Sequence, residues 1–303
     1  MAIRGARILV TGPTSQVAAP VIRSLAADNH VYGLARLRRD EDRARVEALG
    51  AEPIAADLAG PLDGVPDDVD YVLHFAVVKS GDFPYDLRVN AEGSARLLAH
   101  CRGARGFLHV SSTAVYAYAG HEPRREESPL GDNHRSMFPT YSIAKIAAES
   151  TVRFAAEAFG VPTLIARLSV PYGDEGGWPW WHLMMMKAGQ PIPVHPEAPN
   201  VYNPLHEDDY TAHVPRLLDA AQLPAATLNW GGSEPASIEA WTAYLCELTG
   251  LEAKLEKTDR AFGSLETDLT RMHALLGPTK VPWRDGIRRM VEARNPELLA
   301  SRS

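Results

Sequence analysis

The sequence predicts an α/β fold in which a doubly wound parallel sheet carries a small C-terminal lobe. Three observations predict it. Short apolar runs alternate with amphipathic stretches from residue 7 to residue 168, and a glycine-containing turn joins the first run to the first amphipathic stretch. After Pro171 this alternation stops, and prolines and tryptophans become frequent. Strands that alternate with helices are typical of βαβ units, whose strands lie parallel to one another.

The apolar runs of the first half predict six strands, at residues 7–11, 30–35, 52–56, 70–76, 106–111 and 163–168. The amphipathic stretches between them predict helices at 16–27, 43–49, 85–101 and 140–159. In the stretch 85–101, apolar residues recur at intervals that place them on one helical face: Leu87, Ala91, Ala95 and Leu98. We therefore expect residues 1–170 to form the main domain.

Beyond residue 170 the predicted segments are shorter and less regular. We expect helices near 209–220 and 238–249 and a strand at 227–230. No flexible linker separates the two halves, so a clean second domain is not expected. Residues 171–303 should form mainly a small substrate lobe, with elements that return to the main sheet.

Composition limits the class of protein. The chain has 303 residues and a formal net charge of −7, whereas a nucleic-acid-binding surface would be basic. Its two cysteines, Cys101 and Cys246, cannot build a disulfide framework, which favours a reducing compartment. No stretch approaches the roughly 18 apolar residues of a membrane span, and the N-terminus lacks a signal-peptide pattern. We expect a cytoplasmic protein that binds neither nucleic acid nor membrane.

The turn after the first strand has the features of a phosphate-binding loop. A nucleotide pyrophosphate needs backbone N–H groups at a helix N-terminus and little obstruction by side chains. Gly12 supplies the tight turn, and Ser15 and Ala18 are small residues where glycines would be usual. The expected cofactor contacts in this loop are Thr11, Gly12, Thr14, Ser15, Gln16 and Val17. An ordinary structural turn explains the same residues equally well.

The end of the second strand indicates which dinucleotide would bind. NAD sites usually place an acidic residue there, which holds the ribose 2′-hydroxyl. Here the strand ends in Ala35 and is followed by Arg36, whose guanidinium would suit a 2′-phosphate. We predict a preference for NADP(H), with NAD as the alternative. A solvated basic turn is the other interpretation.

Tyr141 and Lys145 lie four residues apart at the start of a predicted helix, so both side chains can face one cleft. A free tyrosine has a pKa of about 10 and is a poor acid or base at neutral pH. A cation about 4 Å away, at an effective dielectric constant near 20, supplies roughly 4 kcal/mol, or about three pKa units. Ser112 ends the fifth strand, at the sheet edge where such folds bind ligands. Each feature alone is also explained by coincidence or by a turn.

The chain resembles the short-chain dehydrogenase/reductase superfamily, in its extended branch of epimerase- and dehydratase-like proteins with a Rossmann fold. The resemblance covers nearly the whole chain and depends on the order and spacing of several motifs. These are Thr11-Gly12, Asp57-Leu58, Leu73-His74-Phe75-Ala76, Asn90, Val110-Ser111-Ser112 with Val115-Tyr116, Tyr141 to Lys145, Arg167 with Pro171-Tyr172-Gly173, and Leu205 to Asp209.

The resemblance implies roles for individual residues. Tyr141 would be the catalytic acid/base, Lys145 would hold the nicotinamide ribose and lower the pKa of the tyrosine, and Ser112 would orient the substrate oxygen. Asp57 and Leu58 would meet the adenine. The remaining cofactor contacts would be Ala76, Val77 and Pro171, with Asn90 either shaping the site or fixing backbone in its helix.

Two positions depart from relatives that act on nucleotide sugars. Those proteins often carry an asparagine where this chain has Val170 and an arginine where it has Tyr202, and both contact substrate phosphate. The substrate side is instead apolar, with Trp178, Trp181 and Met185 as expected contacts. This segment is either the core of the small lobe or an apolar lid over a small, weakly charged substrate.

Three functions remain as hypotheses. The first is an NADP(H)-dependent oxidoreductase that interconverts a carbonyl and an alcohol on a small, weakly charged substrate. The second is a nucleotide-sugar epimerase or dehydratase with tightly bound NAD(P), and the third is a non-catalytic protein that senses dinucleotides. The histidines show no metal-ligand spacing, so no metal is expected. A homodimer through the helices 85–101 and 140–159 is plausible, although the alanines of the second helix fit packing on the sheet equally well.

Overall fold

The computed structural model describes residues 2–299 and is built around a seven-stranded parallel sheet. The strand order is β12–β6–β5–β4–β1–β2–β3. The strands are β1 (Arg7–Thr11), β2 (His30–Ala35), β3 (Glu52–Ala55), β4 (Tyr71–His74), β5 (Gly106–Ser112), β6 (Thr163–Leu168) and β12 (Ala226–Trp230). The order reverses between β1 and β4, so the sheet is doubly wound and the predicted fold class is confirmed.

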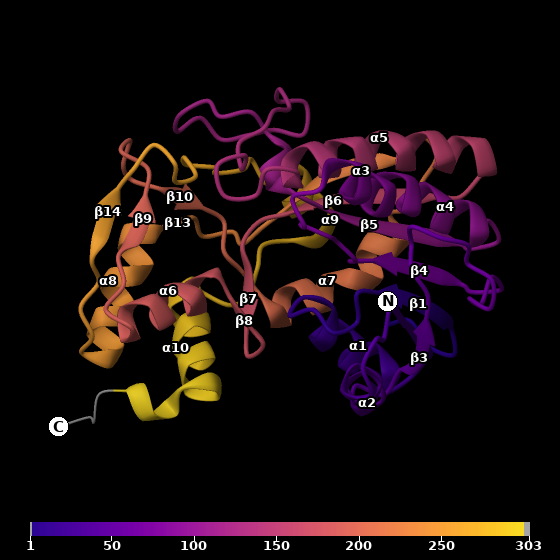
Figure 1. Ribbon diagram of the computed structural model, residues 1–303, viewed down its shortest axis with the longest axis horizontal. Helices are drawn as coiled ribbons and strands as arrows, with labels where there is room; N and C mark the ends of the chain where they lie inside the picture. The colour runs from indigo at the N-terminus through magenta and orange to yellow at the C-terminus, as the bar shows by residue number, and fades with distance from the viewer. Residues whose placement is uncertain (1, 300–303) are drawn as a thin grey trace.

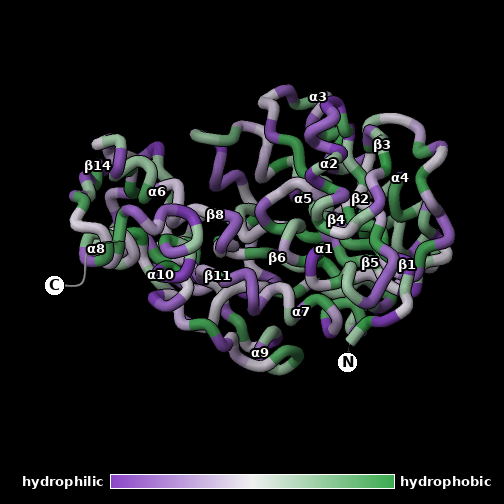
Figure 2. The backbone as a smooth tube through the Cα atoms, turned by 90° about the horizontal axis from the view of Figure 1, so that it is seen from below, coloured by the Kyte–Doolittle hydropathy of each residue, from purple (hydrophilic) through white to green (hydrophobic). Residues whose placement is uncertain are grey.

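Helices cover both faces of this sheet (Figure 1). One face packs against α1 (Ala18–Ala26), α2 (Asp40–Ala48), α7 (Glu207–Asp219) and α9 (Thr270–Leu276). The other face packs against α4 (Gly93–His100) and α5 (Tyr141–Phe159). In Figure 2 the strands at the middle of the sheet are coloured mainly hydrophobic, as expected where both faces are buried.

The helix predicted at 85–101 is not continuous. It consists of α3 (Phe83–Leu87), a π-helical turn η1 (Arg88–Glu92) and α4. A π turn inserts one extra residue into a helix and is frequently found at functional sites. Here the turn contains Asn90, which contacts the loop after β4. The helix predicted at 43–49 begins earlier, at Asp40, where three acidic residues occupy its first turn and favour its N-terminus.

A third hydrophobic core belongs to the C-terminal lobe. It is formed by α6 (Trp178–Lys187), α8 (Ile238–Thr249), α10 (Trp283–Arg294) and short strands. These strands are β9 (Ile192–Val194) with β14 (Leu255–Lys257), and β10 (Val201–Tyr202) with β13 (Ala236–Ser237). A small sheet of β7 (Pro171–Gly173), β8 (Gly176–Gly177) and β11 (Leu205–His206) follows β6. The division of the chain at residue 170 stays a prediction.

The sequence did not predict the helix α6. It begins Trp178-Pro179-Trp180, and neither proline nor closely spaced tryptophans are typical of a helix. Proline is tolerated there because the N–H groups of the first helical turn have no partner within the helix. None of the helices described over residues 2–299 is long and apolar enough to cross a membrane.

A buried ion pair ties α5 to the sheet. Both oxygens of Glu149 on α5 accept hydrogen bonds from Arg167 on β6, at 2.9 Å from Nε and 2.7 Å from Nη2. The hydroxyl of Ser111 donates to the same carboxylate at 2.7 Å. The side chain of Glu149 is 0% exposed and that of Arg167 is 3% exposed. Burial raises the pKa of Glu149, but its hydrogen bonds and charge attraction with Arg167, together with Ser111 and Arg153, outweigh this and hold the pKa below its ordinary value.

We expect Glu149→Gln to lower the free energy of unfolding by about 3 kcal/mol at neutral pH, because it leaves the Arg167 guanidinium buried without a counter-charge. Denaturant unfolding measures this, and Glu157→Gln on the exposed face of the same helix is the control. Since the folded pKa of Glu149 is depressed, the stability it contributes is present above the unfolded pKa and is lost as the pH falls through the folded pKa. Equal stability of both variants at neutral pH would contradict this assignment.

Candidate active site

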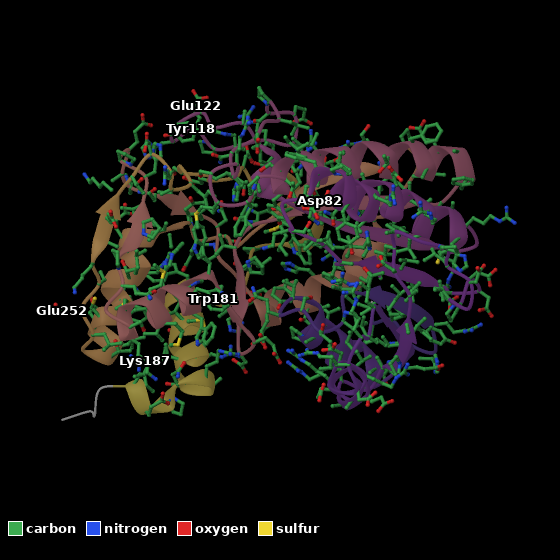
Figure 3. All side chains as sticks on the ribbon, viewed as in Figure 1. Asp82, Tyr118, Glu122, Trp181, Lys187 and Glu252 are labelled. Atoms are coloured by element: carbon green, nitrogen blue, oxygen red, sulfur yellow. The ribbon has the colours of Figure 1, made fainter. Side chains whose placement is uncertain are left out.

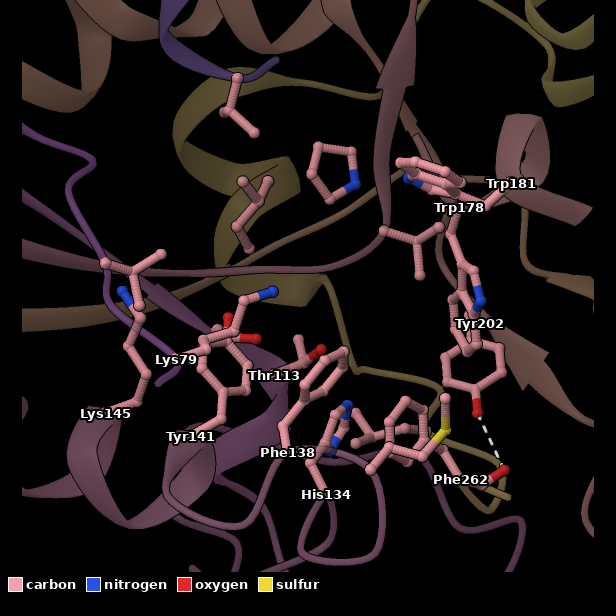
Figure 4. Close-up of a pocket in the computed structure, with 18 of the residues that line it drawn as sticks. Lys79, Thr113, His134, Phe138, Tyr141, Lys145, Trp178, Trp181, Tyr202 and Phe262 are labelled. Atoms are coloured by element: carbon pink, nitrogen blue, oxygen red, sulfur yellow. Dashed lines mark hydrogen bonds between the residues drawn. The ribbon is translucent and has the colours of Figure 1, made fainter. Parts of the chain in front are cut away.

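A cleft of about 650 Å³ opens at the carboxyl ends of β1, β4, β5 and β6 and extends toward the C-terminal lobe. Figure 4 shows a close-up of it. One end is formed by the loop after β1, the middle by Ser112, Tyr141 and Lys145, and the far end by α6 and the segment around Phe262. The carboxyl edge of a doubly wound sheet is where such folds bind ligands.

The loop after β1 has the geometry of a dinucleotide cradle. Gly12 has a φ of +67°, and a Cβ there would lie 3.1 Å from the Cα of Ala76, so only glycine fits. Ser15 accepts a hydrogen bond from the N–H of Ala18 at 3.2 Å, at the start of α1. Ser15, Gln16 and Val17 line the cleft. These features fit a bound pyrophosphate at the N-terminus of α1.

The other two predicted loop residues are placed differently. Thr14 lies partly buried in the same turn. Thr11 is fully buried, and its hydroxyl contacts the Nδ1 atom of His74 at 2.7 Å and accepts from the N–H of Ala76 at 3.0 Å. Its side chain therefore faces the protein interior and positions Ala76 rather than a ligand.

The residues predicted to meet the adenosine half lie beyond β2 and β3. Arg36 is exposed, and its Nη1 atom donates to the hydroxyl of Tyr85 at 3.0 Å. Asp57 accepts from the N–H of Ala59 at 3.0 Å, and Leu58 is buried. These contacts hold the segments after β2 and β3 in place.

Asn90 fixes the backbone of a neighbouring loop. Its amide donates to the carbonyl of Val78 and accepts from the N–H of Val78, both at 2.8 Å. The same loop carries Val77, which is 38% exposed and lines the cleft. At the opposite wall, the carbonyl of Pro171 accepts from the Nε2 atom of Gln16 at 3.4 Å. Asn90 therefore fixes the loop after β4 rather than backbone within its own helix, and its role in the site stays a prediction.

Tyr141 and Lys145 both line the cleft, as their spacing predicts, and Ser112 lies opposite them. Ser111, by contrast, is directed to Glu149. The Nζ atom of Lys145 donates to the carbonyl of Val110 at 2.8 Å. The pKa of Lys145 is lowered to about 8, mainly by burial, with Glu149 opposing the shift and the nearby charge of Lys79 adding to it.

The expected lowering of the Tyr141 pKa is wrong for the protein by itself. Burial raises the pKa of the Tyr141 phenol above its ordinary value, and hydrogen bonding to Ser112 offsets this only in part. The physical reason is desolvation, which disfavours the charged form of both side chains. Tyr141 is thus held as a proton donor.

The far wall of the cleft is aromatic. The ring centroid of Trp178 lies 4.9 Å from that of Tyr202 and 5.9 Å from that of Phe262, both edge to face. Tyr202 is buried, and its hydroxyl donates to the carbonyls of Gly263 at 2.8 Å and Phe262 at 3.2 Å. Val170, a β-branched residue with a φ of +32°, lines the same cleft.

The tryptophan segment contributes to both the lobe core and the cleft, through different residues of α6. Leu183 and Met186 are buried in the lobe core. Trp178, Trp181 and Met185 line the cleft, and Trp181 is 57% exposed. Figure 3 shows Trp181 at the end of α6 that faces the main sheet.

Residues that the sequence reasoning missed complete the site. The ammonium of Lys79 lies 4.5 Å from the ring centroid of Phe138 and 5.3 Å from that of Tyr141. His134 stacks on Phe262 with ring centroids 3.9 Å apart. Lys79 follows the carboxyl end of β4, a position that could have marked it in the sequence. His134 and Phe138 belong to an irregular loop, whose path no periodicity reveals.

The charge of the cleft is sparse. Over the part of the chain that the structure describes, its lining contains Lys79 and Lys145 but no arginine, aspartate or glutamate. Within the same residues no group of three His, Cys, Asp or Glu could hold a metal ion. The polar groups of the lining are therefore hydroxyls of serine, threonine and tyrosine, the amide of Gln16, two amines, and the rings of His134 and His182.

The sequence matches a known family over most of its length. The model of the NAD dependent epimerase/dehydratase family matches residues 8–231. The chain belongs to this family. The expected resemblance is thereby confirmed, and the enzyme class predicted for the chain is that of this family.

Curated relatives carry names from nucleotide-sugar chemistry. A dTDP-D-glucose 4,6-dehydratase of Mus musculus is 26% identical, over 94% of this chain and 88% of its own length. A trifunctional UDP-glucose 4,6-dehydratase, epimerase and reductase of Arabidopsis thaliana is 24% identical over 77% of this chain. The chain spans 37% of that longer protein.

Solved structures share the fold. UDP-glucuronic acid 4-epimerase from Bacillus cereus, in complex with UDP-glucuronic acid and NAD, gives a TM-score of 0.81 at 20% identity and covers 95% of this chain and 98% of its own. A dTDP-glucose 4,6-dehydratase from Streptomyces venezuelae, with NAD bound, gives 0.80 at 22% identity and covers 95% and 96%. At these identities the likeness shows the fold.

Gly12→Ala tests the dinucleotide cradle. We expect it to weaken binding of NADH or NADPH by at least about tenfold, because the new Cβ would press on Ala76 where the pyrophosphate approaches. Fluorescence titration of the reduced cofactor measures this. Gly5→Ala is the matched control, since Gly5 has a similar φ of +64° with nothing within 4 Å of its Cβ. If both variants bound cofactor like the wild type, the loop would not be the cradle.

Proposed function

We propose that the protein is a nicotinamide-dependent oxidoreductase that interconverts an alcohol and a carbonyl on a small, weakly charged substrate. The observation that carries the proposal is the convergence of Ser112, Tyr141 and Lys145 on one cleft beside the Gly12 loop. These are the groups that a proton-coupled hydride transfer needs: an orienting hydroxyl, a proton donor and a fixed cation.

The chemistry of the site divides into simple steps. A bound nicotinamide would supply or accept the hydride. Tyr141 would donate its phenolic proton to the substrate oxygen during reduction and take it back during oxidation. Ser112 would hydrogen-bond the same oxygen and hold the carbon in place. Lys145, anchored on the carbonyl of Val110, would offer its remaining N–H groups to the cofactor ribose.

The far wall supports a weakly charged substrate. Val170 and Tyr202 stand where nucleotide-sugar enzymes often carry phosphate-binding side chains, and the Tyr202 hydroxyl is already engaged with backbone carbonyls. Trp178, Trp181 and Met185 would instead contact apolar parts of the substrate.

The comparisons favour a second candidate, a nucleotide-sugar epimerase or dehydratase with retained NAD. The family model, the curated relatives and the solved structures give this candidate more support than the first. The cleft argues for epimerisation within it, because elimination of water needs a further acid/base pair and no carboxylate lines the cleft over residues 2–299. A sensor without activity is the least supported function, since the proton donor and the lysine are both present.

The cofactor preference, the homodimer and the cytoplasmic location stay predictions. The solved relatives hold NAD, whereas Arg36 at the end of β2 supports NADP(H). A dimer through α4 and α5 is supported by Phe154 on α5, which is 74% exposed.

Turnover distinguishes the candidate functions. We expect net consumption of NADPH with a panel of ketones and aldehydes, followed at the absorbance band of the reduced nicotinamide. Conversion of a UDP- or dTDP-sugar with retained cofactor and no net consumption would establish the epimerase instead.

In either case Tyr141→Phe should lose at least about 100-fold of the rate while binding cofactor normally. Tyr71→Phe, at the opposite edge of the sheet, is the control.

Arg36→Ala tests the cofactor preference. We expect it to weaken NADPH binding by about 10- to 100-fold, because a charge-assisted hydrogen bond to the 2′-phosphate is lost, and to leave NADH binding nearly unchanged. Arg38→Ala, an exposed neighbour, is the control. A wild-type protein that bound NADH as tightly as NADPH would contradict the preference.

A further inference from the structure

Asp86 is a fully buried carboxylate that the proposed chemistry does not use. It lies in α3 and accepts hydrogen bonds from four donors. The hydroxyl of Ser80 donates at 2.6 Å, the N–H of Ser80 at 3.0 Å, the N–H of Gly81 at 3.2 Å and the hydroxyl of Thr140 at 2.6 Å. A buried carboxylate satisfied by neutral donors from two separate segments connects those segments.

Each segment carries a residue of the site next to its contact with Asp86. Lys79 precedes Ser80, and Tyr141 follows Thr140. Thr140 is the N-cap residue of α5, where a threonine hydroxyl usually accepts from an N–H of the first turn. Here it makes no such bond and donates to Asp86. The first turn of the catalytic helix is therefore tied to Asp86 in place of its own cap.

We propose that Asp86 is a positioning residue of the acid/base site. It fixes the two segments that carry Lys79 and Tyr141, so that the ammonium stays close to the phenol ring. The cation then stays over the phenol ring, 5.3 Å from its centroid. A cation at that place favours the phenolate form, so Lys79 assists proton transfer from Tyr141. The proposal rests on the proposed role of Tyr141 as proton donor.

Lys79, Lys145 and His134 are the titratable groups that line the cleft with the Tyr141 phenol, and the buried Asp86 lies behind them, bonded to Ser80 and Thr140. Lys79 and Lys145 favour the phenolate when charged, and Asp86 opposes it. His134 is neutral near pH 7, because burial lowers its pKa to about 4. Burial lowers the pKa of Lys79 as well. Burial would raise the pKa of Asp86, but its hydrogen bonds hold it below the ordinary value.

Loss of the Asp86 charge and loss of its hydrogen bonds act on Tyr141 with opposite signs. If Asp86 acted only as a negative charge, Asp86→Asn would make Tyr141 ionise at lower pH. If it positions Lys79, the same change releases the ammonium from the ring, and Tyr141 ionises at higher pH. An asparagine replaces the carboxylate only in part, because its NH₂ group cannot accept from the N–H groups of Ser80 and Gly81 and must be accepted by a reoriented hydroxyl.

The test is a titration of tyrosinate absorbance between about pH 8 and pH 12, around the ordinary tyrosine pKa of about 10. Rapid mixing into each buffer lets the reading precede unfolding. Each variant is compared with its own Tyr141→Phe version, so that only Tyr141 is reported. We expect Lys79→Met to move the onset of the Tyr141 ionisation upward, by less than about one unit because the lowered pKa of Lys79 leaves part of it neutral in this range, and Asp86→Asn to move it in the same direction. In the Lys79→Met background, Asp86→Asn should no longer raise it.

Asp82→Asn is the matched control, because it removes an exposed carboxylate four residues away without touching Ser80 or Thr140 side chains. It should leave the ionisation unchanged. If Asp86→Asn does not fold, Thr140→Val removes one of the same bonds and should shift the ionisation upward by less. A downward shift, or a loss of melting temperature with no shift, would overturn the proposal. The titration needs no substrate, so its failure is distinct from a failure to find turnover.

Discussion

The buried pair of Glu149 and Arg167 fixes how α5 sits on the sheet. Its two parallel hydrogen bonds join the helix to β6, and Ser111 joins the same carboxylate to β5. Residues four apart share a helical face. Because Glu149 is held against the sheet, the side chains of Lys145 and Tyr141 on the same face of α5 are also oriented. The proposed acid/base site therefore depends on a charge pair that is not part of the cleft lining.

Burial explains the protonation state of the site as well as its stability. Desolvation raises the pKa of Tyr141 and lowers that of Lys145 to about 8, so near pH 7 the phenol stays neutral while the ammonium remains mostly charged. The phenol is kept protonated until another charge changes the balance. A bound oxidised nicotinamide would add one positive charge, and Lys79 over the ring adds another. Proton release from Tyr141 would therefore depend on which positive charges are present in the cleft.

The cleft combines a family cradle with an unusual far wall. The Gly12 loop has the close backbone approach that dinucleotide sites need. On the substrate side, Tyr202 uses its hydroxyl to hold the segment around Phe262, and Trp178 packs against both rings. A side chain bound in this way cannot neutralise a diphosphate. Membership of the family favours a nucleotide sugar as the substrate. The aromatic far wall favours a less charged substrate.

The sequence by itself determined the sheet, because strands buried on both faces read as apolar runs and helices as periodic stretches. It also determined Gly12, Ser112, Tyr141 and Lys145, since these lie at strand ends or on one helical turn, where local spacing fixes direction. Only the tertiary structure decided the rest. Lys79 reaches the ring of Tyr141, and Asp86 meets Thr140, across more than 50 positions of the chain, through irregular loops that carry no period. The pKa of the phenol was likewise decided by burial, which spacing cannot reveal.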